Sequence, residues 1–351
     1  MDDLSRLPSF SEASVARALC SRYEGERIYT WVSSMLLALN PHAPLPLYTQ
    51  RELRAHRVGE GGRVPHVFGV GAAAFKGMLG GRSQCVLVTG ESGAGKTESC
   101  RRLLQFLGSS GKEGGEGGGK GGEGDGGGCS PLCESVATSE GVLEAFGNAG
   151  TLMNANSSRF GKFLSLRFCH GAMVGGSVRT YLLEKTRVVS HAPGERAFHV
   201  LYALIDGMGG AEARELFGQQ KVSPSTFAYT AETDGGGGGY VGWRGVGAEE
   251  RGEGGRLSQV GEALHALGVG QHEQWAIWRC LAAVLHLGNL QFEGGEATSV
   301  SGGTEESLQI AASLLGVSVE ALRKSFVSRC IQARQPTSTR ATTLQPTTPP
   351  P

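Results

Sequence analysis

The 351-residue sequence lacks an excess of charge of either sign. Its 33 lysines and arginines balance 33 aspartates and glutamates, so the formal net charge is zero. A balanced chain exerts no long-range attraction on nucleic acid or on an anionic membrane surface. We therefore expect no nucleic-acid partner, and binding partners have to be argued from individual sites.

Long apolar runs are also missing. A membrane-spanning helix needs about 20 consecutive apolar residues, and no stretch of this chain is that long and apolar. The first six residues, MDDLSR, have neither the basic start nor the apolar run of a signal peptide. The sequence therefore predicts no membrane span and a soluble, intracellular chain.

The eight cysteines lack the regular spacing of a disulfide framework. The one close pair, Cys129 and Cys133, has three residues between its members and no cluster of histidines or cysteines nearby. Two reduced thiols are the better interpretation of this pair, and two zinc ligands are the alternative.

Glycine, in contrast, is abundant, with 57 residues against an ordinary share of about 7%. Residues 111–128 contain twelve glycines. Because the segment has too few apolar groups to offset the conformational entropy lost on ordering it, we expect a surface loop there. Residues 231–255 are predicted to be a second glycine-rich insertion. The Thr/Pro-rich residues 337–351 are predicted to be a disordered tail.

Limited proteolysis checks the prediction for residues 111–128. A low dose of a Lys- or Glu-specific protease is expected to cut this segment first, because cleavage needs an accessible backbone that can become extended. Mass spectrometry of the earliest fragments identifies the cut. Protection at Lys112 and Lys120 would show instead that the loop is packed or bound.

Residues 90–97 match the phosphate-binding pattern G-x-x-x-x-G-K-[ST]. Upstream, residues 85–88 read as a short buried strand, and downstream, residues 96–107 carry leucines with helical spacing. A strand, a glycine loop and a helix in this order predict a phosphate site. A chance match in a glycine-rich chain is the alternative, and the flanking strand and helix patterns argue against it. The eight residues are Gly90, Glu91, Ser92, Gly93, Ala94, Gly95, Lys96 and Thr97.

Each residue type in this loop suits a phosphate. Glycine lets backbone N–H groups turn toward phosphate oxygens, and the helix N-terminus adds a partial positive charge. Lys96 would neutralise the outer phosphates, and the hydroxyl of Thr97 would ligate Mg²⁺.

The rest of the chain alternates helical and strand patterns. Residues 28–39 read as a β-rich stretch and residues 162–184 as a β-hairpin. In a helix near residues 272–286, Trp275, Trp278, Leu281 and Leu285 form one stripe, which predicts core packing and not a ligand platform. Further helices are expected at residues 13–22, 134–146, 195–206, 258–267, 305–315 and 319–326.

A second polar segment, NANSSRFGKF at residues 154–163, lies about sixty positions beyond the glycine loop. Its hydroxyl and amide groups, beside Arg159 and Lys162, suit hydrogen bonds to a phosphate and a ligand for its metal. Alone, the segment would be read as a polar turn before a strand. Together with a phosphate loop, it favours a nucleotide site.

These motifs resemble those of one family. The strings GESGAGKTES, NANSSRFGKF and YLLEKTRVV are similar to the phosphate loop, switch I and the following strand of the myosin motor domain. Further landmarks occur in family order, from residue 3 to about residue 335: NPHAPLPLY, PHVF, LEAFGNA, GERAFHVLY and LHLGNLQF. In kinesins switch I reads Ser-Ser-Arg-Ser-His, whereas in this chain Ser157-Ser158-Arg159 is followed by Phe160-Gly161-Lys162.

The resemblance implies an α/β P-loop NTPase core, with a mixed central sheet flanked by helices, over residues 1–336. It implies the ATP-binding portion of an actin-based motor in the cytoplasm and cytoskeleton, with ATP, Mg²⁺ and actin filaments as cofactors and partners. The Asp-Ile-x-Gly-Phe-Glu pattern of switch II does not occur between Phe292 and Pro351. We therefore expect a truncated motor domain that lacks most of the actin-docking surface.

The resemblance also implies a role for individual residues. Asn40, Pro41 and Tyr48 would flank the adenine, and residues 90–97 would wrap the phosphates. Thr97 and Ser158 would hold Mg²⁺. Asn154 would contact the phosphates, Ser157 would lie near the attacking water and relay its proton, and Arg159 would meet a switch II glutamate. Ala155 replaces the Asp or Asn common at its position, from which we expect little effect.

Phosphoryl transfer depends on positioning and electrostatics, so the missing switch II residues should slow hydrolysis by several powers of ten. Whether this chain alone acts as an ATPase is left open. A short nucleotide-binding or scaffold protein derived from a myosin head is the alternative to a motor portion. An unrelated P-loop kinase or GTPase is disfavoured, because the chain has no Asn-Lys-x-Asp base-reading motif.

Overall fold

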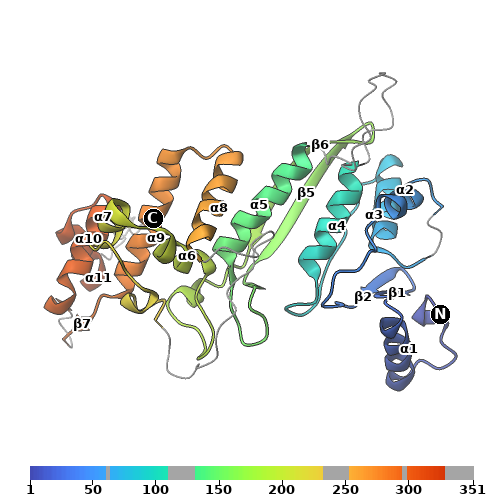
Figure 1. The fold of residues 1–351 in the computed structure, drawn as a ribbon, viewed down its shortest axis with the longest axis horizontal. Coiled ribbons are helices and arrows are strands. Elements are labelled where there is room, and N and C mark those ends of the chain that lie inside the picture. The colour runs from blue at the N-terminus through green and yellow to red at the C-terminus, as the bar shows by residue number, and fades with distance from the viewer. Residues whose placement is uncertain (61–63, 110–130, 232–252, 295–298, 329–351) are drawn as a thin grey trace, which may run out of the picture.

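The computed structural model describes residues 1–60, 64–109, 131–231, 253–294 and 299–328. The molecule is elongated, with the N-terminal hairpin and α1 at one end, α4, α5 and a long hairpin in the middle, and the helices from α6 onward at the other end (Figure 1). The predicted loop at residues 111–128, most of the insertion at residues 231–255 and the tail at residues 337–351 lie outside the described residues.

The N-terminal end consists of a short 3₁₀ turn, a helix and a β-hairpin. The turn η1 spans Leu4–Arg6 and the helix α1 spans Glu12–Glu24, where the side chain of Ser11 caps the first turn. Strand β1 (Tyr29–Val32) pairs antiparallel with β2 (Met35–Ala38), which confirms the predicted β-rich stretch. Arg22 of α1 is buried and donates to the Thr30 hydroxyl and the Tyr29 carbonyl, so α1 is fastened to the hairpin.

Three helices follow, α2 (Gln50–Arg57), α3 (Val67–Leu79) and α4 (Lys96–Gly108). The helix α4 confirms the helix predicted after the glycine loop. Phe68 of α3 is fully buried and stacks on Phe106 of α4, with the ring centroids 5.6 Å apart. Gly71 permits this approach, because a Cβ there would lie 2.8 Å from the Phe106 ring. The core thus fixes α3 against the helix that the glycine loop opens.

The middle of the molecule is the helix α5 (Pro131–Gly147) beside a long antiparallel hairpin (Figure 1). The hairpin pairs β5 (Gly161–Cys169) with β6 (Ala172–Tyr181) and is irregular between Arg167 and Phe168. It confirms the hairpin predicted at residues 162–184, except that the second strand ends at Tyr181. Two short strands, β3 (Asn148–Ala149) and β4 (Ser157–Ser158), pair antiparallel at the ends of the segment that contains Asn154.

The far end is mostly helical and holds the largest hydrophobic cluster, in which Leu204, Leu216 and Leu285 are fully buried. Trp278 is also buried there, and Trp275 and Leu281 pack at its edge, so the predicted core role of the tryptophan stripe is confirmed. The helices are α6 (His199–Gly207), α7 (Gly210–Phe217), α8 (Glu253–Ala266), α9 (Gln271–Gly288), α10 (Glu305–Leu315) and α11 (Val319–Val327). Short elements between them are η3 (Lys185–Val188), η4 (Pro224–Thr226), β7 (Phe292–Glu293), β8 (Ser299–Val300) and η5 (Gly302–Thr304).

The helix α6 begins four residues later than predicted. Its N-cap, Phe198, is extended and forms a β-bridge with Ala149. Glu195 accepts a hydrogen bond from Arg187, and the carbonyl of Arg196 accepts another from the same side chain. Because these tertiary contacts engage the backbone and side chains of residues 195–198, the helical spacing is not realised there.

Two β-structure predictions need correction. Residues 85–88 form no strand, and they are not buried, since Leu87 is 84% exposed. The four sheets found in the described parts of the chain are all two-stranded and antiparallel, so the predicted mixed central sheet is not among them. A strand exists only where a neighbour supplies N–H and C=O partners, and no described strand pairs with residues 85–88. Within the described ranges, no helix has the length and apolarity needed to cross a membrane.

Candidate functional site

The glycine loop has the backbone that its sequence requires. Gly93 and Gly95 have φ angles of 81° and 86°, in the left-handed region that glycine enters without the steric cost of a Cβ. Gly95 is the N-cap of α4, and no side chain caps this end of the helix. The uncapped N–H groups and the helix dipole make this terminus suitable for an anion.

The ammonium of Lys96 bends back over the loop. Its Nζ donates to the carbonyls of Gly90 and Glu91, with both distances 2.7 Å. The positive charge is therefore held at the loop by neutral acceptors. A phosphate group with formal negative charge would be a stronger acceptor for this donor than either carbonyl.

The segment at residues 154–159 meets the glycine loop directly. The Ser92 hydroxyl donates to the Ser157 hydroxyl across 2.9 Å, and Asn154 Nδ2 donates to Ser92 Oγ across 3.2 Å. From the N-terminal side, Asn40 Nδ2 donates to the Gly93 carbonyl across 2.7 Å. The structure thus brings together three predicted segments that are 50 to 65 positions apart in sequence.

Asn156 joins this segment to residues of the adjacent strand β3 and helix α6. Its Oδ1 accepts a hydrogen bond of 2.8 Å from Asn148 Nδ2 and lies 3.2 Å from Nε2 of His199 on α6. Asn148 and His199 are both buried. The sequence analysis assigned no role to these three residues, although all of them lie within the family landmarks. Asparagine and histidine are also common on protein surfaces, so the residue type alone does not reveal a buried structural role.

Arg159 lies in a chain of ion pairs. It donates to the Ser157 hydroxyl across 3.2 Å and forms an ion pair with Glu184. Glu184 also pairs with Arg187, which in turn pairs with Glu195. Partial burial acts to raise the pKa of Glu184, but the hydrogen bonds from Arg187 and Arg159 outweigh it and the pKa is lowered. Glu184 was missed in the sequence, where its only signal is an acidic residue beside Lys185 and Arg187.

Lys162 does not join the loop. Its ammonium forms an ion pair with Glu140 of α5, which is buried. The charge of Lys162, which the sequence places beside the polar segment, is therefore neutralised within the central hairpin and helix.

The residues expected to hold a metal differ in exposure. Ser157 is 1% exposed, whereas the neighbouring Ser158 of β4 is exposed, and Thr97 lies half-buried in the first turn of α4. Among the described residues there is no group of three or more His, Cys, Asp or Glu side chains that could hold a metal ion. This donor set fits a hard ion such as Mg²⁺ held by hydroxyl and phosphate oxygens, and it does not fit zinc. Of the cysteine pair considered for zinc, Cys133 is buried near the Leu104 carbonyl, and Cys129 lies outside the described residues.

Tyr48, predicted to flank the adenine with Asn40 and Pro41, is held from two sides. Its hydroxyl lies 2.8 Å from the hydroxyl of Tyr29, and the guanidinium of Arg102 on α4 lies 4.1 Å from the centre of its ring. Tyr48 and the glycine-loop helix are therefore linked through Arg102, another residue that the sequence did not single out.

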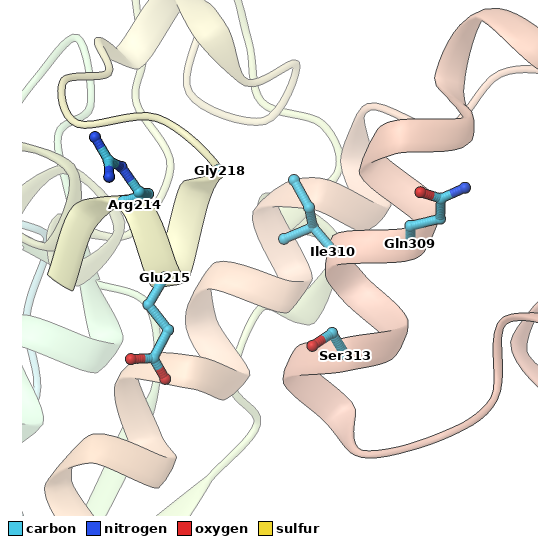
Figure 2. A pocket seen from close by; sticks show the side chains of 6 residues that line it. All are labelled: Arg214, Glu215, Gly218, Gln309, Ile310 and Ser313. Carbon is cyan, nitrogen blue, oxygen red and sulfur yellow. The ribbon is translucent and has the colours of Figure 1, made fainter. Parts of the chain in front are cut away.

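A separate hollow of about 230 Å³ lies between α7 and α10 (Figure 2). It is at the opposite end of the molecule from the N-terminal hairpin (Figure 1). Its lining has no glycine loop and none of the predicted site residues, so it is not the nucleotide site. The residues that line it are Arg214, Glu215, Gly218, Gln309, Ile310 and Ser313.

The chain is similar to known proteins over nearly its whole length. The sequence profile of the family described as Myosin head (motor domain) matches residues 1–348. Myosin-5 of Arabidopsis thaliana is 34% identical over 358 residues, which cover 99% of this chain and 22% of that protein. Myosin-1 of Coccidioides immitis is 33% identical, with 95% and 25% covered. Unconventional myosin IC of Drosophila melanogaster is 35% identical, with 92% and 29% covered. The chain therefore spans between 22% and 29% of the length of these relatives.

Proposed function

Because the chain belongs to the myosin motor-domain family, we propose that residues 1–351 form the ATP-binding portion of an actin-based cytoskeletal motor. Its partners are ATP with Mg²⁺ and, in a complete motor, actin filaments. A cytoplasmic location in the cytoskeleton follows from this role.

The convergence of two distant segments on the glycine loop supports the proposal most directly. Ser92 bonds to Ser157 and Asn154, and Gly93 bonds to Asn40. Side chains from the adenine-side segment and the switch segment thus contact two adjacent residues of the eight-residue loop that would wrap the phosphates. A chance match to the loop pattern would not place these partners around it.

The side chains at the loop then have distinct roles. Lys96 exchanges its carbonyl partners for the outer phosphates, the N–H groups at the start of α4 bind the inner ones, and Asn154 adds an amide donor. Asn40, Pro41 and Tyr48 hold the adenine. When bound, Mg²⁺ neutralises phosphate charge, and Thr97 and Ser158 supply hydroxyl ligands for it. Ser157, held by Arg159, orients the water that attacks.

Residues 1–351 alone are proposed to hydrolyse ATP slowly. The Asp-Ile-x-Gly-Phe-Glu pattern is absent from this sequence, so no second gating segment completes the constellation around the outermost phosphate. Arg159 forms an ion pair with Glu184. This ion pair holds Ser157 in place but contributes no group to the attacking water. Positioning losses of this kind cost several powers of ten in rate.

Thr97→Val tests the metal assignment, because valine keeps the shape of threonine and removes only the hydroxyl. We expect the ATP affinity in the presence of Mg²⁺ to fall about tenfold, which corresponds to about 1.4 kcal/mol for the loss of one hydrogen bond or metal ligand. The ATP affinity in EDTA should be unchanged. Isothermal titration calorimetry measures both. Thr180→Val, at an exposed position of β6, is the matched control. An equal loss in EDTA would show that Thr97 does not act through a metal.

The proposal as a whole is tested by equilibrium dialysis of labelled ATP and GTP with the purified chain. Selective ATP binding supports the proposed ATP-binding portion. The second function, a nucleotide-binding or scaffold protein, is separated from it by sequencing the transcript beyond the codon for Pro351: an in-frame Asp-Ile-x-Gly-Phe-Glu stretch supports the motor, and a stop codon favours the second function. Failure to bind ATP would overturn both.

A further inference from the structure

His66 is a buried residue whose two ring nitrogens are both used. It is 6% exposed and is the N-cap of α3. Its Nδ1 accepts a hydrogen bond of 3.1 Å from the backbone N–H of Phe68, and its Nε2 lies 3.1 Å from the Leu47 carbonyl. A carbonyl can only accept, so the proton of the neutral ring is on Nε2. The contacts therefore define one tautomer, which caps a helix on one side and bonds a loop on the other.

The loop that His66 bonds is the one that carries Tyr48. The Tyr48 ring packs 5.8 Å from the His66 ring, and its hydroxyl bonds to Tyr29. His66 also packs 4.6 Å from Phe68, whose ring stacks on Phe106 of α4. A continuous set of contacts thus runs from the helix that begins at Lys96, through α3, to the backbone of Leu47 and Tyr48.

The surroundings of His66 favour the neutral ring. His56 of α2 packs against it at 5.0 Å, and Tyr29 of β1 lies on another side at 5.3 Å. Burial, followed by the nearness of His56, lowers the pKa of His66 to about 4, against the opposing effect of the hydrogen bond to Leu47. A proton on Nδ1 would face the N–H of Phe68 and break the cap. The tautomer that makes both bonds is therefore the one present at neutral pH.

We propose that His66 is a positioning residue for the adenine. Through its Nε2–H bond to Leu47, it holds the segment that carries Tyr48 against α3 and α4. His66 thereby sets the affinity for the base and not the affinity for the phosphates. This inference rests on the proposed nucleotide site. It assigns to the histidine of the PHVF string a role in base affinity that acts through Leu47 and Tyr48, without contact between His66 and the nucleotide.

The variant His66→Asn separates the two bonds of the histidine. Asparagine is a favourable N-cap and can accept from the N–H of Phe68, but its shorter side chain does not also reach Leu47. We expect the affinity for Mg²⁺–ATP to fall about tenfold, as for the loss of one buried hydrogen bond, and the affinity for Mg²⁺–tripolyphosphate, which has no base, to change less than about twofold. His272→Asn, at an exposed histidine in the first turn of α9, is the matched control.

Two results would overturn the inference: an equal loss of affinity for ATP and tripolyphosphate, or no loss for either. A general structural defect would lower the affinity for both ligands, and a residue without a role would change neither affinity. Binding of tripolyphosphate but not ATP by the wild type would overturn the adenine side of the proposed function, and binding of neither would overturn the phosphate site itself.

A second measurement needs no variant. In the wild type labelled with ¹⁵N-histidine, NMR is expected to show His66 as the neutral Nε2–H tautomer at pH 7 and still neutral near pH 5.5, where an unperturbed histidine with a pKa of about 6.5 is mostly charged. A His66 ring with its proton on Nδ1, or one that charges like an unperturbed histidine, would contradict the inference even if the variant did not fold.

Discussion

Replacing Lys96 by alanine is expected to weaken ATP binding by roughly 100-fold, which corresponds to about 3 kcal/mol for the loss of charge-assisted hydrogen bonds to phosphate. The ammonium already lies at the loop, bonded to the Gly90 and Glu91 carbonyls, so binding requires an exchange of acceptors and little movement of the chain. The fold should be preserved, because these two bonds join residues of one loop and involve no core side chain. Equilibrium dialysis or titration calorimetry with ATP measures the effect.

Lys221→Ala is the control for this change. Lys221 is exposed and lies after α7, in the helical far end of the molecule, so its loss alters net charge by the same amount without touching the site. It should leave ATP affinity within about twofold of the wild type. Equal retention of nucleotide by the wild type and Lys96→Ala would count against the assignment of residues 90–97 as a phosphate loop.

Phe68→Ala is expected to destabilise the chain by about 3–5 kcal/mol, the range for a phenylalanine removed from a packed core. Phe68 is 0% exposed, and its ring contacts Phe106, His66 and Tyr48. The substitution leaves a cavity between α3 and α4 that these neighbours can fill only in part. Urea denaturation followed by circular dichroism gives the free energy of unfolding.

Phe10→Ala provides the matched comparison, since Phe10 is 70% exposed and surface substitutions usually change stability by less than about 0.5 kcal/mol. If the two variants lost similar stability, the packing of α3 on α4 would not be the core contact described above. Because α4 begins with Lys96, loosening at Phe68 should also weaken ATP binding in the folded fraction.

Helices and the long hairpin were predictable because their signals are local. The helix α10 begins and ends at the predicted residues, and α4 begins at the predicted Lys96. In both cases apolar residues recur at helical spacing, and the glycines Gly95 and Gly316 with positive φ mark one end. In the long hairpin, partly buried and exposed residues alternate from Leu164 to Cys169 of β5, and the chain turns at His170 and Gly171, which both have positive φ.

The same reasoning was wrong at residues 85–88. Their two valines have strong β-propensity, yet Leu87 is 84% exposed and no described strand pairs with these residues. β-propensity describes how well a residue fits a sheet that already exists, and a neighbouring strand comes from elsewhere in the chain. Composition within four residues therefore could not decide the outcome.

Residues of the candidate site divide in the same way. The glycine loop and the polar segment at residues 154–159 were predicted to form the site from their own residue types and spacing. Glu184, His199 and Arg102 were not, although they contact Arg159, Asn156 and Tyr48 respectively. Their types are common in ordinary surface and core positions, so nothing in the local sequence marks them.

By itself, the sequence determined the family, the glycine backbone at Gly93 and Gly95, and most helix positions, because each of these depends on residues within a few positions of one another. Only the tertiary structure decided which side chains face each other: Ser92 with Ser157, Asn40 with Gly93, and His66 with Leu47. Such pairs form when separate helices and loops bury their apolar faces together, and the polar groups brought inside must then find partners that replace water.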